Sequence, residues 1–147
     1  TAEKLSDGWY YTGDVFFQEA NGDVTLVGRV DDMIRSGGES IHPEEVEAVL
    51  ETFPGIAEVS VVGIRDRKWG QLVVACIRTS APPDERMVAD LDQHCIKSSL
   101  SGFKRPKAYF SVSEMPRNAA NKVLRRELRS AAETASSDKA AEFQNVT

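Results

Sequence analysis

Hydrophobic residues near the start of the chain fall into two short runs, at positions 15–17 and 24–27, with a polar stretch between them. This stretch contains Asn-Gly at 21–22, a pair that tolerates the positive φ angles of tight hairpin turns. The pattern therefore predicts a β-hairpin over residues 14–29. Residues 30–42 are more polar and contain glycines, so we expect a junction with short extended pieces there.

Apolar residues recur at helical spacing in three later segments. In the first, Pro43 suits the opening turn of a helix, and the acidic residues after it favour the positive end of the helix dipole. This helix should end before Pro54. A second amphipathic pattern covers about residues 84–97, and a third runs from 123 to about 132. These segments predict three helices.

Strand-like runs lie between the predicted helices, at positions 56–64, 72–78 and 108–112. Because strands and helices are mixed along the chain, the predicted fold class is α+β. It consists of an N-terminal β-hairpin strip followed by a small three-stranded sheet packed with about three helices. Beyond residue 136 the chain is small and polar with little to bury, and we expect a disordered tail.

The composition is that of a folded protein. The chain has 147 residues, 41% hydrophobic and 28% charged, which is enough for one domain, or one domain plus a strip of another. The formal net charge of −5 argues against binding of nucleic acid or an anionic membrane through bulk charge. No apolar run approaches the roughly 20 residues of a transmembrane helix, and no secretion signal is recognisable.

The cysteines and histidines suggest no metal site. Cys76 and Cys95 lie in apolar surroundings, so we expect two buried thiols in a reducing cytoplasm, with a disulfide as the less favoured alternative. His42 and His94 are the only histidines, and neither has a spaced partner that would complete a metal site. The sequence contains neither a Gly-x-Ser-x-Gly motif nor a Walker-type loop, which argues against a self-contained hydrolase or phosphotransferase.

Two charged residues near the hairpin suit a nucleotide. Asp14 directly precedes a predicted strand, and the two oxygens of a carboxylate match a vicinal diol such as a ribose. The alternative is a carboxylate that caps a turn. Arg29 offers a planar donor fork for phosphate or ribose oxygens, and the alternative is a surface ion pair.

Three further places suit other parts of a ligand. Lys122 lies on a polar loop before a helix, where a lysine can deliver charge to the oxygens of a transition state, although a solvated lysine is the alternative. Gly37 and Gly38 would let a thin ligand pass close to the backbone, and a simple turn explains them equally well. Lys104 and Arg105 follow an aromatic residue and suit phosphate, with Trp69 as a stacking surface. The alternative for this basic stretch is a solvated charged loop.

Taken together, these stretches resemble the C-terminal part of adenylate-forming enzymes, the superfamily of acyl- and aryl-CoA synthetases, peptide-synthetase adenylation domains and firefly luciferase. Four motifs occur in the family's order across about residues 7–128: Asp7-Gly8-Trp9-Tyr10-Tyr11-Thr12-Gly13-Asp14, Gly28-Arg29-Val30-Asp31-Asp32-Met33-Ile34, Gly38-Glu39-Ser40-Ile41-His42-Pro43-Glu44-Glu45-Val46-Glu47, and Pro116 through Lys122 to Arg126. Residues 36–43 and 104–107 are more similar to fatty-acyl and benzoate or chlorobenzoate CoA ligases than to peptide-synthetase domains.

The resemblance implies a two-step reaction. A carboxylate attacks the α-phosphate of ATP to form an acyl-adenylate and pyrophosphate, and a thiol, usually that of CoA, then displaces AMP. By motif position, Asp14 and Arg29 would bind the nucleotide, and Lys122 would be the catalytic lysine of adenylation. Asp31 would be the hinge around which a small domain swings between two poses.

The same resemblance implies the ligands. Gly37 and Gly38 would line the CoA path, and Trp69, Lys104 and Arg105 would contact the CoA nucleotide. ATP or AMP and CoA are the expected ligands, Mg²⁺ would accompany ATP in the complete enzyme, and the acyl-adenylate would be the intermediate.

The resemblance also divides the chain. Residues 1–30 would be the end of a large N-terminal adenylation domain, residues 31–135 the mobile C-terminal domain, and residues 136–147 the disordered tail. The rest of the large domain, with its phosphate loop and acid pocket, would be missing, so we expect this chain alone to be inactive in adenylation. Trp9, Tyr10 and the hairpin phenylalanines would normally pack on that domain. Without it, they would be mobile or would pair with a second copy in a homo-oligomer.

One departure from the family pattern and two alternative functions remain. Where the commoner pattern has Thr, and then Gly immediately before the lysine, this chain has residues 118–121, and Asn121 can adopt a left-handed backbone that would preserve the loop. One alternative is a stand-alone nucleotide- or CoA-binding or regulatory module without catalysis. The other is an adenylation domain that loads the thiol of a carrier protein.

Overall fold

A computed structural model describes residues 5–6, 9–10, 12–137 and 144–145 of the chain. At its N-terminal end, β1 (Leu5–Ser6) pairs with β2 (Trp9–Tyr10). The side chains of Trp9, Tyr10 and Tyr11 lie outside the described part, as do residues 7–8 of the first motif.

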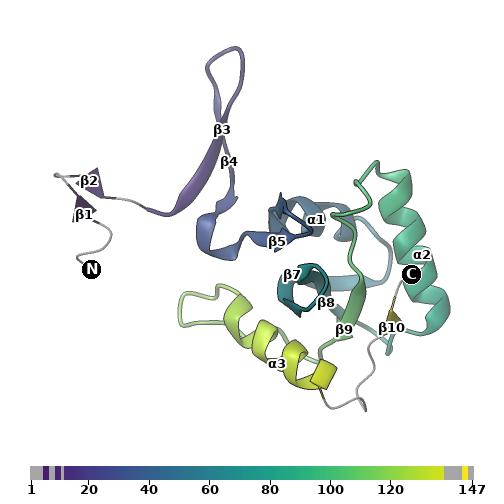
Figure 1. The fold of residues 1–147 in the computed structure, drawn as a ribbon. Helices are drawn as coiled ribbons and strands as arrows, with labels where there is room; N and C mark the ends of the chain where they lie inside the picture. The colour runs from purple at the N-terminus through teal and green to yellow at the C-terminus, as the bar shows by residue number, and fades with distance from the viewer. Residues whose placement is uncertain (1–4, 7–8, 11, 138–143, 146–147) are drawn as a thin grey trace.

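The predicted hairpin is confirmed. β3 (Asp14–Gln18) pairs with β4 (Val24–Arg29) in antiparallel register, and Gly22 in the connecting turn has a φ of +95°. Figure 1 shows this hairpin projecting away from the compact remainder of the molecule. A short 3-10 helix, η2 (Val30–Asp32), connects it to that remainder.

The predicted three-stranded sheet forms the centre of a wider sheet. β7 (Ile56–Asp66) and β8 (Gly70–Thr79) are a long antiparallel pair, and β9 (Ala108–Ser111) lies parallel to β8. Three short strands extend this sheet to six: β5 (Ile34–Ser36), β6 (Glu39–Ile41) and β10 (Gln144–Asn145). Strands of two or three residues are too short to show a hydrophobic period, so only pairing with the long strands defines them.

The three predicted helices are present, at α1 (Pro43–Leu50), α2 (Glu85–Lys97) and α3 (Arg125–Ser137). Pro43 occupies the first turn of α1, and the Asp84 carboxylate caps α2 by accepting from the Met87 amide at 2.8 Å. The fold class α+β is therefore confirmed, with a wider sheet than expected.

The helices cover opposite faces of the sheet, as Figure 1 shows. On one face, α1 and α2 bury apolar residues such as Leu50 and Leu91 against alternate positions of β7 and β8. On the other face, α3 buries Leu128 and Ala132 against the intervening positions. Cys95 belongs to the first cluster and Cys76 to the second, so they form no disulfide and the expected buried thiols are confirmed. Burial is the main cause that raises the pKa of the Cys76 thiol to about 12.

The tail differs from the expectation of disorder at two places. The last turn of α3 includes Ser136 and Ser137, and Gln144–Asn145 pair antiparallel with β9. The open edge of β9 offers unpaired backbone groups to which these residues bond. Residues 138–143 and 146–147 lie outside the described part. Among the described residues, no helix is long and apolar enough to cross a membrane.

Candidate functional site

The two residues predicted to bind a nucleotide meet at the base of the hairpin. Asp14 and Arg29 are directly opposite each other in the β3–β4 register, and the Arg29 Nη1 donates to Asp14 Oδ1 at 3.0 Å. The Arg29 Nη2 also donates to the Thr12 carbonyl at 3.1 Å. Gly13, with a φ of +79°, lets the chain curl beneath the guanidinium. Both polar groups therefore sit on a rigid element, in the surface ion pair that was the alternative interpretation of Arg29.

The loop that carries Lys122 is closed by its own asparagines. Asn118 Oδ1 accepts hydrogen bonds from the amides of Ala120 and Lys122, both at 3.0 Å, and the Asn118 amide donates to the Lys122 carbonyl at 2.9 Å. Asn121 has a φ of +64°, the left-handed conformation that the sequence led us to expect. The loop therefore keeps a tight turn with asparagine where the family commonly has glycine.

An ion-pair cluster fastens the N-terminal side of this loop to the sheet. Glu58 on β7 pairs with Arg117 and accepts from Arg78 Nε at 2.6 Å, while Arg117 also donates to the Asn121 carbonyl at 3.0 Å. The hydrogen bond from Arg78 is the main cause that lowers the pKa of the Glu58 carboxyl; burial opposes it, and Arg117 lowers the pKa further.

A second cluster fastens the C-terminal side of the loop, and the sequence had not pointed to it. Arg125, the first residue of α3, contacts Asp32 at 3.0 Å, Glu44 at 3.4 Å and Glu47 at 2.9 Å. Burial disfavours the charged guanidinium, but the three carboxylates outweigh it and raise the pKa of Arg125. The spacing of Glu44 and Glu47, three apart on one helix, was the available signal for a shared partner.

A cavity of about 640 Å³ lies between these clusters. Its walls include four cationic side chains and four acidic ones: Arg29, Arg117, Lys122 and Arg125, with Asp32, Glu47, Glu51 and Glu58. The three arginines have carboxylate partners. Lys122 is exposed, and among the described residues it has no ion-pair partner. The cavity therefore brings the predicted catalytic lysine and a predicted nucleotide-binding arginine to one space.

A smaller and more apolar pocket, of about 240 Å³, lies on another part of the domain. Its walls are formed by Ser36, Gly37, Glu39, Trp69, Leu72, Gly102, Phe103 and Lys107. Gly37 has a φ of +58°, and its amide donates to the Trp69 carbonyl at 2.9 Å. A Cβ at Gly37 would lie 3.0 Å from the Trp69 ring, so glycine permits this close approach. The structure thus brings Gly37 and Trp69 together, as two of the predicted CoA residues.

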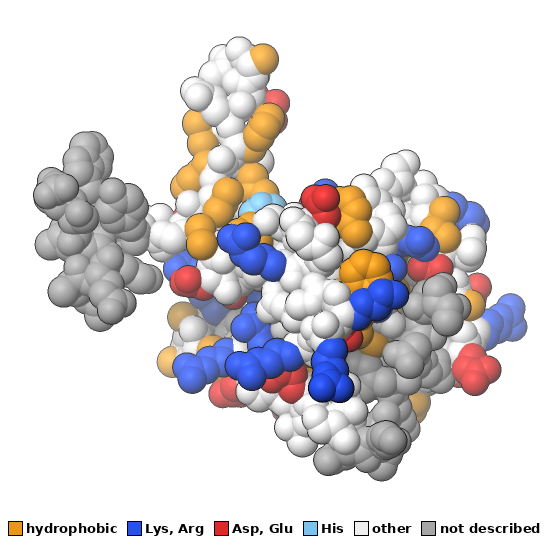
Figure 2. All heavy atoms as spheres, in the orientation of Figure 1, with side chains coloured by type: hydrophobic (Ala, Val, Ile, Leu, Met, Phe, Trp, Pro, Cys, Tyr) orange, Lys and Arg blue, Asp and Glu red, His pale blue; other side chains and the backbone are white. Residues whose placement is uncertain are grey.

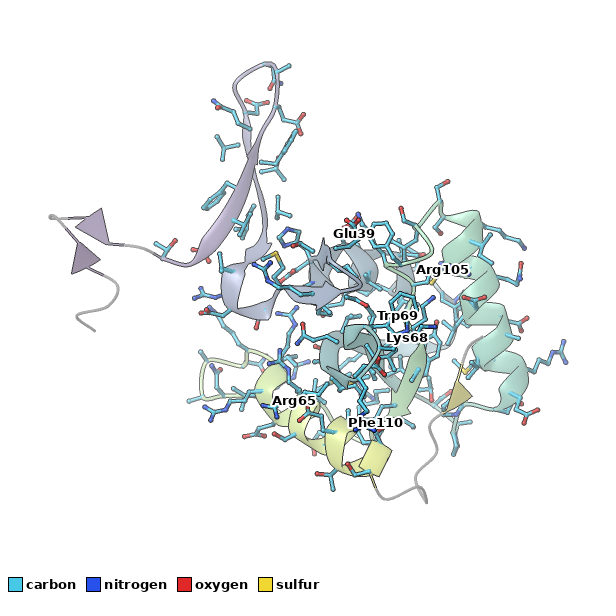
Figure 3. All side chains as sticks on the ribbon, viewed as in Figure 1. Glu39, Arg65, Lys68, Trp69, Arg105 and Phe110 are labelled. Carbon is cyan, nitrogen blue, oxygen red and sulfur yellow. The ribbon has the colours of Figure 1, made fainter. Side chains whose placement is uncertain are left out.

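The other predicted CoA residues lie beside this pocket and do not line it. Gly38 is the exposed residue after Gly37, with a φ of +85°. Lys104 pairs with Glu45 at 2.6 Å, and Arg105 pairs with Asp92 of α2 at 2.9 Å. Figure 3 shows Trp69 and Lys68 next to each other, with Arg105 nearer to α2.

Phe103 and Lys107, in the same basic stretch, line the pocket instead of Lys104 and Arg105. Phe103 is 41% exposed and faces the space that Trp69 borders, and Lys107 donates to the Gly102 carbonyl at 3.0 Å. Residues 102–105 form a turn and a bend instead of a strand, so no side-chain period in the sequence could have selected these two residues.

The predicted hinge residue lies between two fastened neighbours. Asp31 is exposed in η2, while Arg29 before it pairs with Asp14 and Asp32 after it pairs with Arg125. Among the described residues, no group of three or more His, Cys, Asp or Glu side chains is arranged to hold a metal ion.

Comparisons with known proteins give a consistent result. A family model described as the AMP-binding enzyme C-terminal domain matches residues 45–122. A 4-chlorobenzoate–CoA ligase of Arthrobacter sp is 50% identical over 130 residues, which are 88% of this chain and 24% of that ligase. A fatty acid–[acyl-carrier-protein] ligase of Streptomyces coeruleorubidus is 42% identical over 129 residues, which are 88% of this chain and 24% of that protein. This chain thus spans about a quarter of the length of these curated relatives.

A solved structure shares the fold. The o-succinylbenzoate CoA synthetase of Bacillus subtilis, in complex with its acyl-adenylate intermediate, superposes with a TM-score of 0.78 at 37% identity. The match covers 87% of this chain and 26% of the synthetase.

Proposed function

Because this chain belongs to the family of AMP-binding enzyme C-terminal domains, we propose that it is the C-terminal part of an ATP-dependent, AMP-forming carboxylic acid–CoA ligase. The complete enzyme would convert an acid, ATP and CoA to acyl-CoA, AMP and pyrophosphate. Residues 1–30 would end the large adenylation domain, and residues 31–135 would form a small domain that moves over it. The identity between this chain and ligases named for aryl and fatty acids supports an acid of one of these classes.

Lys122 is the proposed catalytic residue of the adenylation step. The observation that carries this role is its position in the larger cavity, where it is the cationic side chain that lacks a carboxylate partner among the described residues. Its ammonium group is therefore available to the acid and the α-phosphate, whose oxygens gain negative charge as the mixed anhydride forms. Closure of the large domain over the cavity would exclude water and strengthen this interaction.

Asp14 and Arg29 are proposed to hold the nucleotide. The Arg29–Asp14 ion pair leaves Asp14 Oδ2 for a ribose hydroxyl, and Arg29 borders the cavity that Lys122 also lines. Asp31 is proposed as the hinge, since it is exposed in the single short turn that connects the hairpin to the compact domain.

The smaller pocket is the proposed binding place for CoA. Trp69 and Phe103 offer aromatic surfaces on which an adenine can stack, and Lys107 supplies a cation at the same pocket. Gly37 and Gly38 present backbone without side chains beside it, which suits the thin pantetheine arm. Lys104 and Arg105 would contact phosphates only by exchanging their present carboxylate partners.

Mg²⁺ would reach this enzyme together with the phosphates of ATP. The described residues include no cluster suited to hold the ion, so its ligands would come from ATP and from the large domain. Cytoplasmic location and self-association remain predictions.

The test of this proposal uses the complete protein and measures the two half-reactions separately. Lys122→Ala should lower the rate of adenylate formation by about a hundredfold or more, because a charge aimed at the transition state is lost. Thioester formation from supplied acyl-adenylate should stay within about threefold of the unchanged protein, because it uses the other pose. Lys97→Ala, an exposed lysine at the end of α2, is the matched control and should change neither rate. Equal losses in both half-reactions would refute the assigned role.

Two other functions have specific support. A binding module without catalysis is favoured by the preformed pocket at Trp69, and calorimetric titration of this chain with CoA would detect it. Transfer to a carrier-protein thiol is favoured by the relative named as an acyl-carrier-protein ligase. Offering CoA and a carrier protein as competing acceptors to the complete enzyme separates this function from CoA ligation.

A further inference from the structure

The turn that joins the hairpin to the compact domain is fastened on both sides. On the hairpin side, Arg29 pairs with Asp14 at 3.0 Å, and the Val30 amide donates to the Gly13 carbonyl at 2.8 Å. On the domain side, Asp32 pairs with Arg125 at 3.0 Å. Asp31, between them, is exposed. A rotation of the hairpin relative to the domain at Asp31 would leave both fastened sides intact and would open the hydrogen bond that the Met33 amide donates to the Val30 carbonyl at 3.3 Å.

A close contact between β4 and α1 spans this turn. Gly28, in the hairpin strand β4, packs against Glu44 of α1 so closely that a Cβ at residue 28 would lie 2.6 Å from Glu44 Oε2. The two residues lie on opposite sides of Asp31 in the chain. A rotation at Asp31 would separate them, so their contact belongs to the present arrangement alone.

The Glu44 carboxylate also contacts Arg125. Its Oε1 lies 3.4 Å from Arg125 Nη1, and Arg125 is also held by Asp32 and Glu47. Its Oε2 is buried and has no hydrogen-bond partner among the described residues. Burial of a carboxylate oxygen without a partner costs free energy. The contact with Gly28 therefore depends on the space that glycine leaves for the carboxylate. No hydrogen bond of Glu44 Oε2 holds the two together.

We propose that Gly28 is a positioning residue, which by its lack of a side chain against Glu44 admits the pose in which Lys122 and Arg29 face the same cavity. This inference rests on the proposed function for its catalytic meaning, although the geometric part stands by itself. The pose that brings Lys122 to the nucleotide side depends on the approach of β4 to α1. A side chain at residue 28 would meet the end of the Glu44 side chain, which is 36% exposed and pairs with Arg125 at 3.4 Å, and would have to displace it from that pair.

Gly28→Ala tests the contact without straining the backbone. The φ of Gly28 lies outside the left-handed region, so alanine can adopt it, and the three atoms nearest to the added methyl group all belong to Glu44. Spin labels at Ala20→Cys in the hairpin turn and Ala89→Cys on α2 would report the distance between the two parts in the 147-residue chain. Both positions are exposed, whereas Cys76 and Cys95 are fully buried and should not react.

The unchanged chain should show one dominant distance between the two labels. In Gly28→Ala, the population at that distance should fall about tenfold relative to the population at other distances, because a methyl group enters a packed contact. Gly28→Ala with Glu44→Ala should restore the distribution, because space is made for the new methyl group. Gly28→Ala with Glu44→Gln should not restore it, because glutamine has nearly the same size. Glu85→Gln, which removes an exposed carboxylate from α2, should leave the distribution unchanged.

An unchanged distance distribution in Gly28→Ala, or equal behaviour of the two double variants, would overturn the proposal. In the complete enzyme, Gly28→Ala should slow adenylate formation about tenfold more than thioester formation from supplied adenylate. If the unchanged enzyme forms no adenylate at all, the proposed function fails, while the distance measurement still decides whether Gly28 selects the pose.

Discussion

The hairpin and the compact domain distribute their hydrophobic residues in opposite ways. Along β3 and β4, Phe16, Phe17, Val24 and Leu26 are all between 56% and 59% exposed, and Figure 2 shows apolar side chains along this projection. In the compact domain, β7 and β8 are covered on both faces by helices and their central residues are fully buried. The domain has completed its own core, whereas the hairpin presents a surface that a further partner would cover. The large adenylation domain is the partner we propose.

The largest expected difference between these regions is in stability. Leu91→Ala in α2 should lower the free energy of unfolding by about 3 kcal/mol, because it opens a cavity in a closed core. Phe17→Ala in the hairpin removes a larger side chain but should change stability by less than about 0.5 kcal/mol, because most of that ring is already in water. Chemical denaturation of the two variants measures both values. Similar losses would mean that the hairpin is packed in solution.

The next effect concerns the cluster that fastens the lysine loop to the hinge region. Arg125→Met should lower the free energy of unfolding by about 2 kcal/mol, because it leaves three carboxylates facing one another. The guanidinium is 20% exposed, so we expect less than the cost of breaking a fully buried pair. Arg126→Met, at the exposed neighbouring position, is the control and should change stability little. A loss of equal size in both variants would show that the charge cluster contributes nothing specific.

The smallest expected effect is the pH dependence of the contribution that Glu58 makes to the free energy of unfolding. The pKa of Glu58 in the folded chain is lowered from its usual 4.5, so its ion pairs stabilise the fold above about pH 5. The contribution is lost as the pH falls through 4.5 toward the folded pKa. The stability difference between the unchanged chain and Glu58→Gln should therefore be constant from pH 5 to 8, below about 1 kcal/mol, and should shrink at lower pH. A difference that grows on acidification would contradict this assignment.

Much of the fold could be predicted from local patterns. The Asn-Gly turn and Pro43 at a helix start act within a few residues of their own position, and the hairpin and α1 formed where they were expected. The short strands at 34–36, 39–41 and 144–145 could not be predicted in the same way. They exist because the edges of the long strands offer them backbone partners.

The candidate site shows the same division. Motif order in the sequence selected Lys122, Asp14 and Arg29, and the structure places Lys122 and Arg29 at one cavity. Motif order did not select Arg125, whose three carboxylate partners lie 78 to 93 residues earlier in the chain, too far for any local rule. Nor could it tell that Lys104 and Arg105 pair with carboxylates while Phe103 and Lys107 line the pocket.

The sequence by itself determined the hairpin, the three helices, the central strands and the residue that we propose for catalysis. Turn chemistry, helix caps and hydrophobic periods depend on near neighbours, and a motif is read along the chain. Only the tertiary structure decided which charges neutralise one another, which cation of the larger cavity has no carboxylate partner among the described residues, and where Gly28 meets Glu44. These outcomes depend on distances between groups far apart in sequence, because the strength of an ion pair or a steric contact is set by separation in space.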